Sequence, residues 1–158
     1  MSRRRVSNNN DVYNQLLKMA AEEMVESGIS EIMPIHLLIA LSRLSEGQSS
    51  DGADDAATVL RHEFELLGIE PRRFRRRLRA LLPNRSDKPH PTTIHRSQSA
   101  QSVFMLAKVL ARASAEEPNP SHLLRATFLL LADMHVTDRG GYPGSGNDPA
   151  DDEIPDEL

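Results

Sequence analysis

Two of the six histidines stand at matching places in a repeated five-residue string, and paired histidines could hold a metal ion. The string occurs as Pro34-Ile35-His36-Leu37-Leu38 and again as Pro120-Ser121-His122-Leu123-Leu124. Zinc takes three or four ligands, commonly at short spacings such as H-E-x-x-H, and the sequence has no such cluster. Proline fits the first turn of a helix, where its missing N–H has no partner to lose. We therefore interpret His36 and His122 as first-turn residues, hydrogen-bonded inside the protein, and expect no metal.

Residue patterns for covalent or phosphoryl chemistry are missing from the sequence. Without cysteine there is no thiol nucleophile, disulfide or thiolate metal site, and no G-x-S-x-G elbow marks a serine nucleophile. A phosphate-binding loop of the form G-x-x-x-x-G-K-[ST] is also missing, because no lysine follows the glycine-rich stretch from Gly140 to Gly146. We expect a chain that is not an enzyme, hydrolyses no ATP and binds no cofactor.

Arginines dominate one short stretch, Arg72-Arg73-Phe74-Arg75-Arg76-Arg77-Leu78-Arg79. Such a run can contact phosphate or an acidic partner, or it can be the solvated face of an amphipathic helix. Phe74, Leu78 and Leu81 fall on the other side of the helix, which favours the solvated face. A contact with the chain's own acidic stretch, Asp148 to Leu158, is a further option. The net charge of −4 argues against a dedicated nucleic-acid binder. We keep Arg72, Arg73 and Arg76 as candidate partner-binding residues.

Helices are the elements that must position these side chains. Tryptophan is absent and aromatic residues make up only 4% of the chain, so Leu, Ala, Met and Val must form the core, which favours helices over sheets. Caps and apolar stripes predict six helices. Their expected bounds are Asp11 (N-cap) to about Ser27, ending at Gly28; Pro34 to Leu44; Ala56 to Leu67, with Ala56, Val59, Leu60, Phe64 and Leu67 inward and Gly68 as C-cap; Pro71 to Leu82; a helix capped by Ser97; and Asn119-Pro120 to about Met134.

The repeated string also predicts the fold class. Its two copies lie 86 positions apart, and the same offset aligns Ala21 with Ala107 and Ala40 with Ala126. Because internal repetition decides architecture, we predict an all-α fold built from a duplicated helical unit. The offset predicts a further helix pair from about residue 142. The sequence there is rich in Gly, Pro and Asp and cannot bury enough apolar surface to fold, so the second unit should be truncated.

The chain accordingly divides into five expected segments. They are a disordered basic and polar arm (1–10), a first helical repeat (11–82), a proline-rich linker (83–96), a second helical repeat (97–136) and a disordered acidic Gly/Pro tail (137–158). The longest apolar run, Phe128 to Ala132, is far too short to span a membrane. No apolar segment follows the N-terminal arginines, which argues against a secretory signal. We expect a soluble, cytoplasmic protein.

Two stretches together resemble a known domain family. The run from Ile32 to Leu41, after an alanine-containing helix, resembles the first repeat of the Clp N-terminal domain, and Ser97 to Ala126 resembles its second repeat. Leu67-Gly68-Ile69-Glu70-Pro71 is similar to the family's turn between its third and fourth helices. This family is the paired helical repeat at the front of Clp/Hsp100 AAA+ unfoldases. The resemblance covers roughly residues 10–132 and implies a bundle with pseudo-twofold symmetry.

The resemblance also implies a function and a set of site residues. Clp N-terminal domains are not catalytic; they bind adaptors or unfolded substrates and pass them to the AAA+ ring. Some members bind phosphoarginine where a glutamate precedes the histidine, but Ile35 and Ser121 stand there in this chain. The family's groove for peptides or adaptors lies on the repeat surfaces. The positions carried over are Ile32, Pro34, Ile35 and His36, with Pro120, Ser121 and His122.

Our leading functional prediction is a binding module that recruits substrate or adaptor proteins to an AAA+ unfoldase or protease, with a Clp/Hsp100 ATPase as a further partner. One alternative is a regulatory, nucleic-acid-associated helical protein that uses Arg72 to Arg79 and the arm Arg3 to Arg5. Another is an accessory subunit that docks on a Clp ring without handling substrates. Dimerisation would complete a truncated second repeat, so the oligomeric state stays open.

Overall fold

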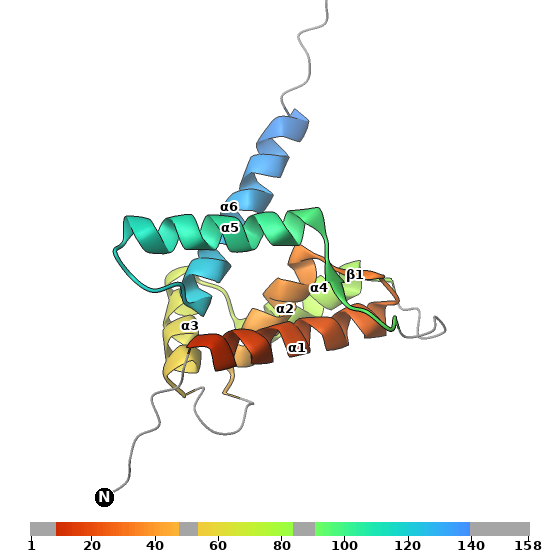
Figure 1. The fold of residues 1–158 in the computed structure, drawn as a ribbon, viewed down its shortest axis with the longest axis horizontal. Helices are drawn as coiled ribbons and strands as arrows, with labels where there is room; N and C mark the ends of the chain where they lie inside the picture. Colours follow the sequence, from red (N-terminus) through yellow and green to blue (C-terminus); the bar gives the residue numbers. More distant parts are fainter. Residues whose placement is uncertain (1–8, 48–53, 84–90, 140–158) are drawn as a thin grey trace, which may run out of the picture.

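Six helices and one short parallel sheet make up the part of the chain that the computed structural model describes, residues 9–47, 54–83 and 91–139 (Figure 1). In chain order they are α1 (Asn9–Ser27), β1 (Glu31–Ile32), α2 (Pro34–Ser45), α3 (Asp54–Leu66), α4 (Pro71–Leu81), β2 (His95–Arg96), α5 (Gln98–Ala113) and α6 (Pro120–Arg139). The mostly helical prediction is confirmed. The sheet is a departure from a purely all-α fold, since Glu31 pairs with His95 and Ile32 with Arg96.

Helix α2 lies at the centre of the core and contacts all five other helices. Its residues from His36 to Ser42 are buried on every side, as expected of a helix that is apolar all round. Figure 1 shows α1 and α5 on either side of α2, and α6 crossing α5 before it extends beyond the body. Large, fully buried side chains around α2 come from α1, α3 and α6: Leu16, Met24, Leu60, Phe64, Leu123 and Leu124.

Two helices end at the glycines that the sequence predicts as C-caps. Gly28 and Gly68 adopt positive φ angles of 67° and 65° just beyond the ends of α1 and α3, as the C-cap predictions required. In the second case the Ile69 N–H donates back to the Phe64 carbonyl at 2.9 Å, which closes a Schellman motif. Helix α5 ends in the same way, but Ala115 takes the left-handed position with φ of 53°.

Several predicted bounds and faces are wrong. Helix α1 begins at Asn9, so Asp11 sits in its first turn instead of capping it. Helix α6 continues to Arg139, past the expected end near Met134. Val59, Leu67 and Leu81 were expected inside but are 47%, 50% and 75% exposed. Each lies on or next to a helix at the rim of the bundle, where only one face of the helix packs against the core.

Part of the predicted organisation falls outside the residues that the structure describes. The arm up to residue 8, residues 48–53 of the loop after α2, residues 84–90 of the linker and the tail from residue 140 lie outside them. The truncation of a second repeat therefore remains a prediction. Within the described ranges, no helix combines the length and apolar character needed to cross a bilayer.

Candidate partner-binding surfaces

The two matching histidines cap the helices that they open. At the start of α2 the Met33 N–H donates to Nδ1 of His36 at 2.9 Å. At the start of α6 the Asn119 N–H donates to Nδ1 of His122 at 3.2 Å. Because Nδ1 accepts in both cases, the proton of the neutral ring belongs on Nε2. Both side chains are buried, and each stabilises the N-terminus of its helix through this hydrogen bond.

The Nε2 atoms of the two histidines have different partners. Nε2 of His36 lies 3.0 Å from the Ser27 hydroxyl, which in turn donates to the Met24 carbonyl. Nε2 of His122 lies 3.2 Å from the carboxylate of Glu116. Burial lowers the pKa of His36 to about 4, although the charge of Glu23 acts in the other direction. The structure thus favours a neutral His36 at physiological pH.

The other carried-over positions are largely covered. Pro34 and Pro120 are buried at the first positions of their helices, Ile32 and Ser121 are 2% and 6% exposed, and Ile35 is half-buried. Together with the histidines these residues form helix starts, not an open face. Contact between any of them and a partner stays a prediction.

Ser121 and His122 do border a hollow of about 530 Å³ between α3 and the start of α6. Glu63 and Arg125 face each other across it and are joined by two hydrogen bonds, one of 3.2 Å from Nε of Arg125. The Arg125 guanidinium lowers the pKa of the Glu63 carboxyl below its usual range. Both charged groups are therefore already paired within the chain.

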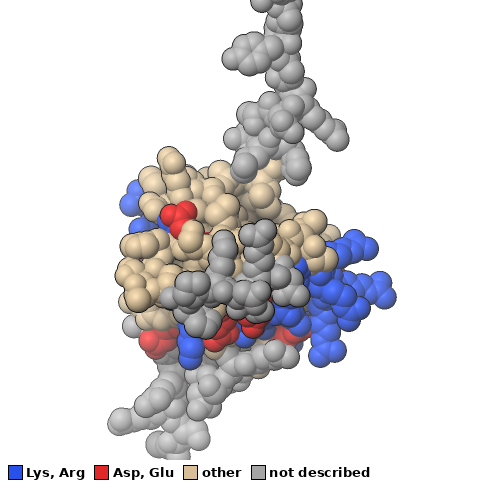
Figure 2. Space-filling view, turned by 90° about the vertical axis from the view of Figure 1, so that its right-hand side faces the viewer, with Lys and Arg blue, Asp and Glu red and all other residues tan. Residues whose placement is uncertain are grey.

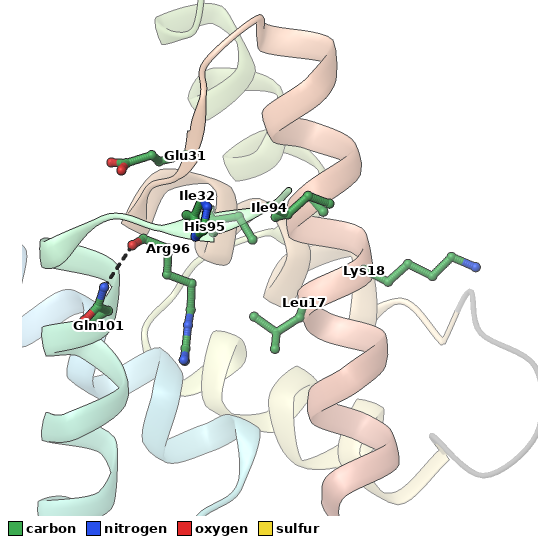
Figure 3. Close-up of a pocket in the computed structure, with 9 residues that line it drawn as sticks. Leu17, Lys18, Glu31, Ile32, Ile94, His95, Arg96 and Gln101 are labelled. Atoms are coloured by element: carbon green, nitrogen blue, oxygen red, sulfur yellow. Dashed lines mark hydrogen bonds between the residues drawn. The ribbon is translucent and has the colours of Figure 1, made fainter. Parts of the chain in front are cut away.

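A larger groove of about 700 Å³ separates α1 from β2 and α5 (Figure 3). Its apolar residues are Leu17, Ala21, Ile32 and Ile94, and its polar residues are Lys18, Glu31, His95, Arg96 and Gln101. Figure 3 shows Leu17 and Arg96 projecting into the space between α1 and α5, while Lys18 points away from it. Ile94 is 50% exposed, so an apolar surface is open to a partner here.

Contacts beside the groove hold its polar wall in place. The Gln101 side chain donates to the Arg96 carbonyl at 3.1 Å. The Arg96 guanidinium lies 4.8 Å from the centre of the Phe104 ring, a cation–π contact, and that ring touches Tyr13 of α1. Of the lining residues, only Ile32 was among the site residues predicted from the sequence. The groove depends on the pairing of β1 with β2, and two residues a strand leave no pattern to detect.

Helix α4 presents the arginine-rich stretch. Phe74 and Leu78 pack against the core as predicted, with the Phe74 ring 6.1 Å from Phe64 and 5.9 Å from Phe128. The arginines lie on the remaining sides of the helix, and Figure 2 shows basic side chains massed at one edge of the molecule. The amphipathic character predicted for this helix is therefore confirmed, and a partner contact of its arginines stays a prediction.

Some of these arginines fasten α4 to the bundle. Glu46, at the end of α2, accepts from Arg72 at 3.1 Å and from Arg75 at 2.8 Å. Glu23 of α1, only 3% exposed, pairs with Arg79 and also with Arg43 of α2. The helix is thus held to α1 and α2 by charge as well as by apolar packing.

Among the described residues, two surfaces are open to a partner: the groove and the outer side of α4. Nowhere in those residues do three potential His, Cys, Asp or Glu ligands come together around a metal position. Comparison with protein-family models finds no family that matches the chain. Comparison with curated proteins finds no significantly similar sequence.

Proposed function

We propose that this chain is a non-catalytic protein-binding module that recruits substrate or adaptor proteins to an AAA+ unfoldase, and that the groove between α1 and α5 receives them. The observation that carries the proposal is the groove itself. It combines an apolar lining, including the half-exposed Ile94, with basic and acidic groups on its walls. Peptide-binding sites typically join apolar pockets for affinity with a few polar groups for orientation.

The paired helix starts support the resemblance on which the recruiting role rests. Met33 and Asn119 stand at equivalent positions by the 86-residue offset, and the N–H of each donates to the histidine three residues later. Helices α1 and α2 pack together, as do α5 and α6, the elements that the offset pairs. These features are expected of two copies of one helical unit, the architecture of the Clp N-terminal domain.

A direct test uses a permanently unfolded protein, with its cysteines carboxymethylated and a fluorophore attached, titrated with the full chain and followed by anisotropy. Ile94→Glu should weaken binding about tenfold, because it removes an apolar contact worth about 1 kcal/mol and adds a charge that must be desolvated. Val109→Glu is the matched control, since Val109 is 57% exposed on α5 and does not line the groove. It should bind like the original chain.

Three results would contradict the proposal. The unfolded probe could fail to bind at all, both variants could lose affinity equally, or both variants could keep the affinity of the original chain. A chain that forms a stoichiometric complex with an AAA+ ring but ignores unfolded protein would instead be an accessory subunit. Circular dichroism of both variants must match the original chain, so that a loss of binding is not a loss of fold.

A further inference from the structure

Part of the positive charge on the outer side of α4 is left without an ion pair among the described residues. Arg73, Arg76 and Arg77 are exposed and make no ion pair within the described residues. Arg72 is 73% exposed although its Nε donates to Glu46. We call these four residues, Arg72, Arg73, Arg76 and Arg77, the basic face. Leu81, 75% exposed, follows Arg73 and Arg77 at four-residue steps along the same helix.

The basic face is held rigidly. Pro71 opens α4, and the Glu70 carboxylate caps it by accepting from the N–H groups of Arg72 and Arg73 at 3.0 and 2.7 Å. Phe74 anchors the inner side of the helix among aromatic rings. A binding partner would therefore meet guanidinium groups on a backbone that is already ordered, which reduces the entropy lost on binding.

We propose that the basic face binds an acidic peptide segment of a partner protein, with Leu81 contacting an apolar residue beside the acidic run. Residues three or four apart on a helix have Cβ atoms about 5–6 Å apart, the spacing of Arg72 with Arg76 and of Arg73 with Arg77. Carboxylates at the same steps on a partner helix, or on alternate residues of an extended strand about 6.6 Å apart, match that spacing. Guanidinium groups bind carboxylates through two parallel hydrogen bonds.

A protein partner fits this surface better than a nucleic acid. Nucleic-acid sites without sequence preference combine a basic groove with aromatic rings on which bases stack. The only aromatic residue of α4, Phe74, points into the core, and the carboxylates of Glu46 and Glu70 border the arginines. The net charge of −4 also opposes approach to a polyanion, whereas a short acidic segment needs only this one helix face.

The basic face is separate from the groove, so the two proposals can fail independently. Lys18 and Ala21 of α1 line the groove. Glu23, which forms an ion pair with Arg79 of α4, lies about 140–160° around the axis of α1 from these two residues. Substitutions on α4 should therefore leave the binding of an unfolded protein at the groove unchanged. The Ile94→Glu variant should likewise leave the basic face unchanged.

The test titrates the full chain into a fluorescein-labelled peptide of alternating glutamate and alanine, with the matching glutamine–alanine peptide as a blank. Arg73→Gln with Arg77→Gln should weaken binding of the glutamate peptide about tenfold, since two exposed charge pairs are lost at a modest contribution each. Lys108→Gln with Arg112→Gln removes the same charge from exposed positions of α5 and should change the affinity less than twofold.

Equal losses in the two double variants, or no binding of the glutamate peptide, would overturn the proposal. So would a single-stranded oligonucleotide that binds more tightly and loses affinity in the α4 variant. Self-association that disappears in that variant would assign the face to a second copy. Peptide binding that emerges only after Asp151→Asn, Asp152→Asn and Glu153→Gln would assign it to the chain's own acidic stretch. Either assignment would also overturn the proposal that the basic face binds a separate partner protein.

Discussion

Acidification should destabilise this protein through one buried imidazole, that of His36. Burial lowers the pKa of His36 to about 4, against about 6.5 in an unfolded chain. Between these values the unfolded chain binds more protons than the folded one, so the stabilisation is fully present above about pH 6.5 and is lost as the pH falls towards 4. One pKa unit corresponds to about 1.36 kcal/mol, so the largest loss is about 3 kcal/mol.

The geometry explains why protonation is costly at this position. Nδ1 of His36 accepts the Met33 N–H at 2.9 Å, and a proton on Nδ1 would set two donors against each other. The ring is also fully buried, so water cannot solvate the new charge. A loss of about 2.5 kcal/mol at about pH 4.5 would be a large fraction of the 5–15 kcal/mol typical of a folded domain.

The assay is urea unfolding followed by circular dichroism at about pH 7 and about pH 4.5, for the original chain and for His36→Gln. Glutamine at the third helical position can accept the same N–H as part of a capping box but does not titrate in this range. The variant should therefore lose about 2.5 kcal/mol less than the original chain between the two pH values. His95→Gln, on exposed β2, is the control and should follow the original chain.

Carboxylates also titrate in this pH range, but they do so in the original chain and in both variants. Their contribution to the free energy of unfolding therefore cancels when each variant is compared with the original chain. If His36→Gln and the original chain lose the same stability on acidification, the protonation of His36 does not limit the fold. The reasoning from burial and from the Nδ1 hydrogen bond would then be wrong. A smaller loss in His95→Gln would count against it equally, because that ring is not buried.

Three further predictions concern the fold. Ala115→Gly should raise the free energy of unfolding by about 1 kcal/mol, because Ala115 pays for a left-handed φ of 53° that glycine adopts freely. Gly68→Ala should lower it by about 1 kcal/mol, since φ there is 65° but no atom lies within 4 Å of the added Cβ. Glu23→Gln should lower the free energy of unfolding by about 1–3 kcal/mol, because Arg43 and Arg79 lose the charge of a nearly buried carboxylate but can still be solvated by water. The loss should be smaller in high salt, which screens these ion pairs. Urea unfolding measures all three; a destabilised Ala115→Gly or an unaffected Glu23→Gln would contradict the respective argument.

Much of the helical framework could be predicted because helix starts and stops depend on atoms within one turn. Asn119 shows this at α6, where its side chain accepts the N–H groups of Ser121 and His122 at 2.9 and 3.2 Å. Ser97 does the same for α5 by accepting from Ala100 at 3.1 Å. The cap residue and the group that it satisfies are neighbours in the chain. The same locality made the hydrogen-bonded histidines and the inward side of α4 predictable.

The binding surfaces could not be predicted in the same way, because their parts are far apart in the chain. The groove exists because Glu31 and Ile32 pair with His95 and Arg96, and no periodicity marks two-residue strands. Nor could the sequence separate the arginines of α4 by role. Arg79 is paired because Glu23, on another helix, lies beside it, whereas Arg76 has no such neighbour among the described residues.

Sequence alone therefore determined most of the helix ends in this protein and that one helix would be strongly basic. Tertiary structure decided which arginines of α4 form ion pairs with other described residues, that Ile94 opens into a groove and that Leu81 stays exposed. The physical reason is the range of the interactions. Caps and turns act over three or four residues, while burial and charge pairing depend on which distant segments the packed core brings together.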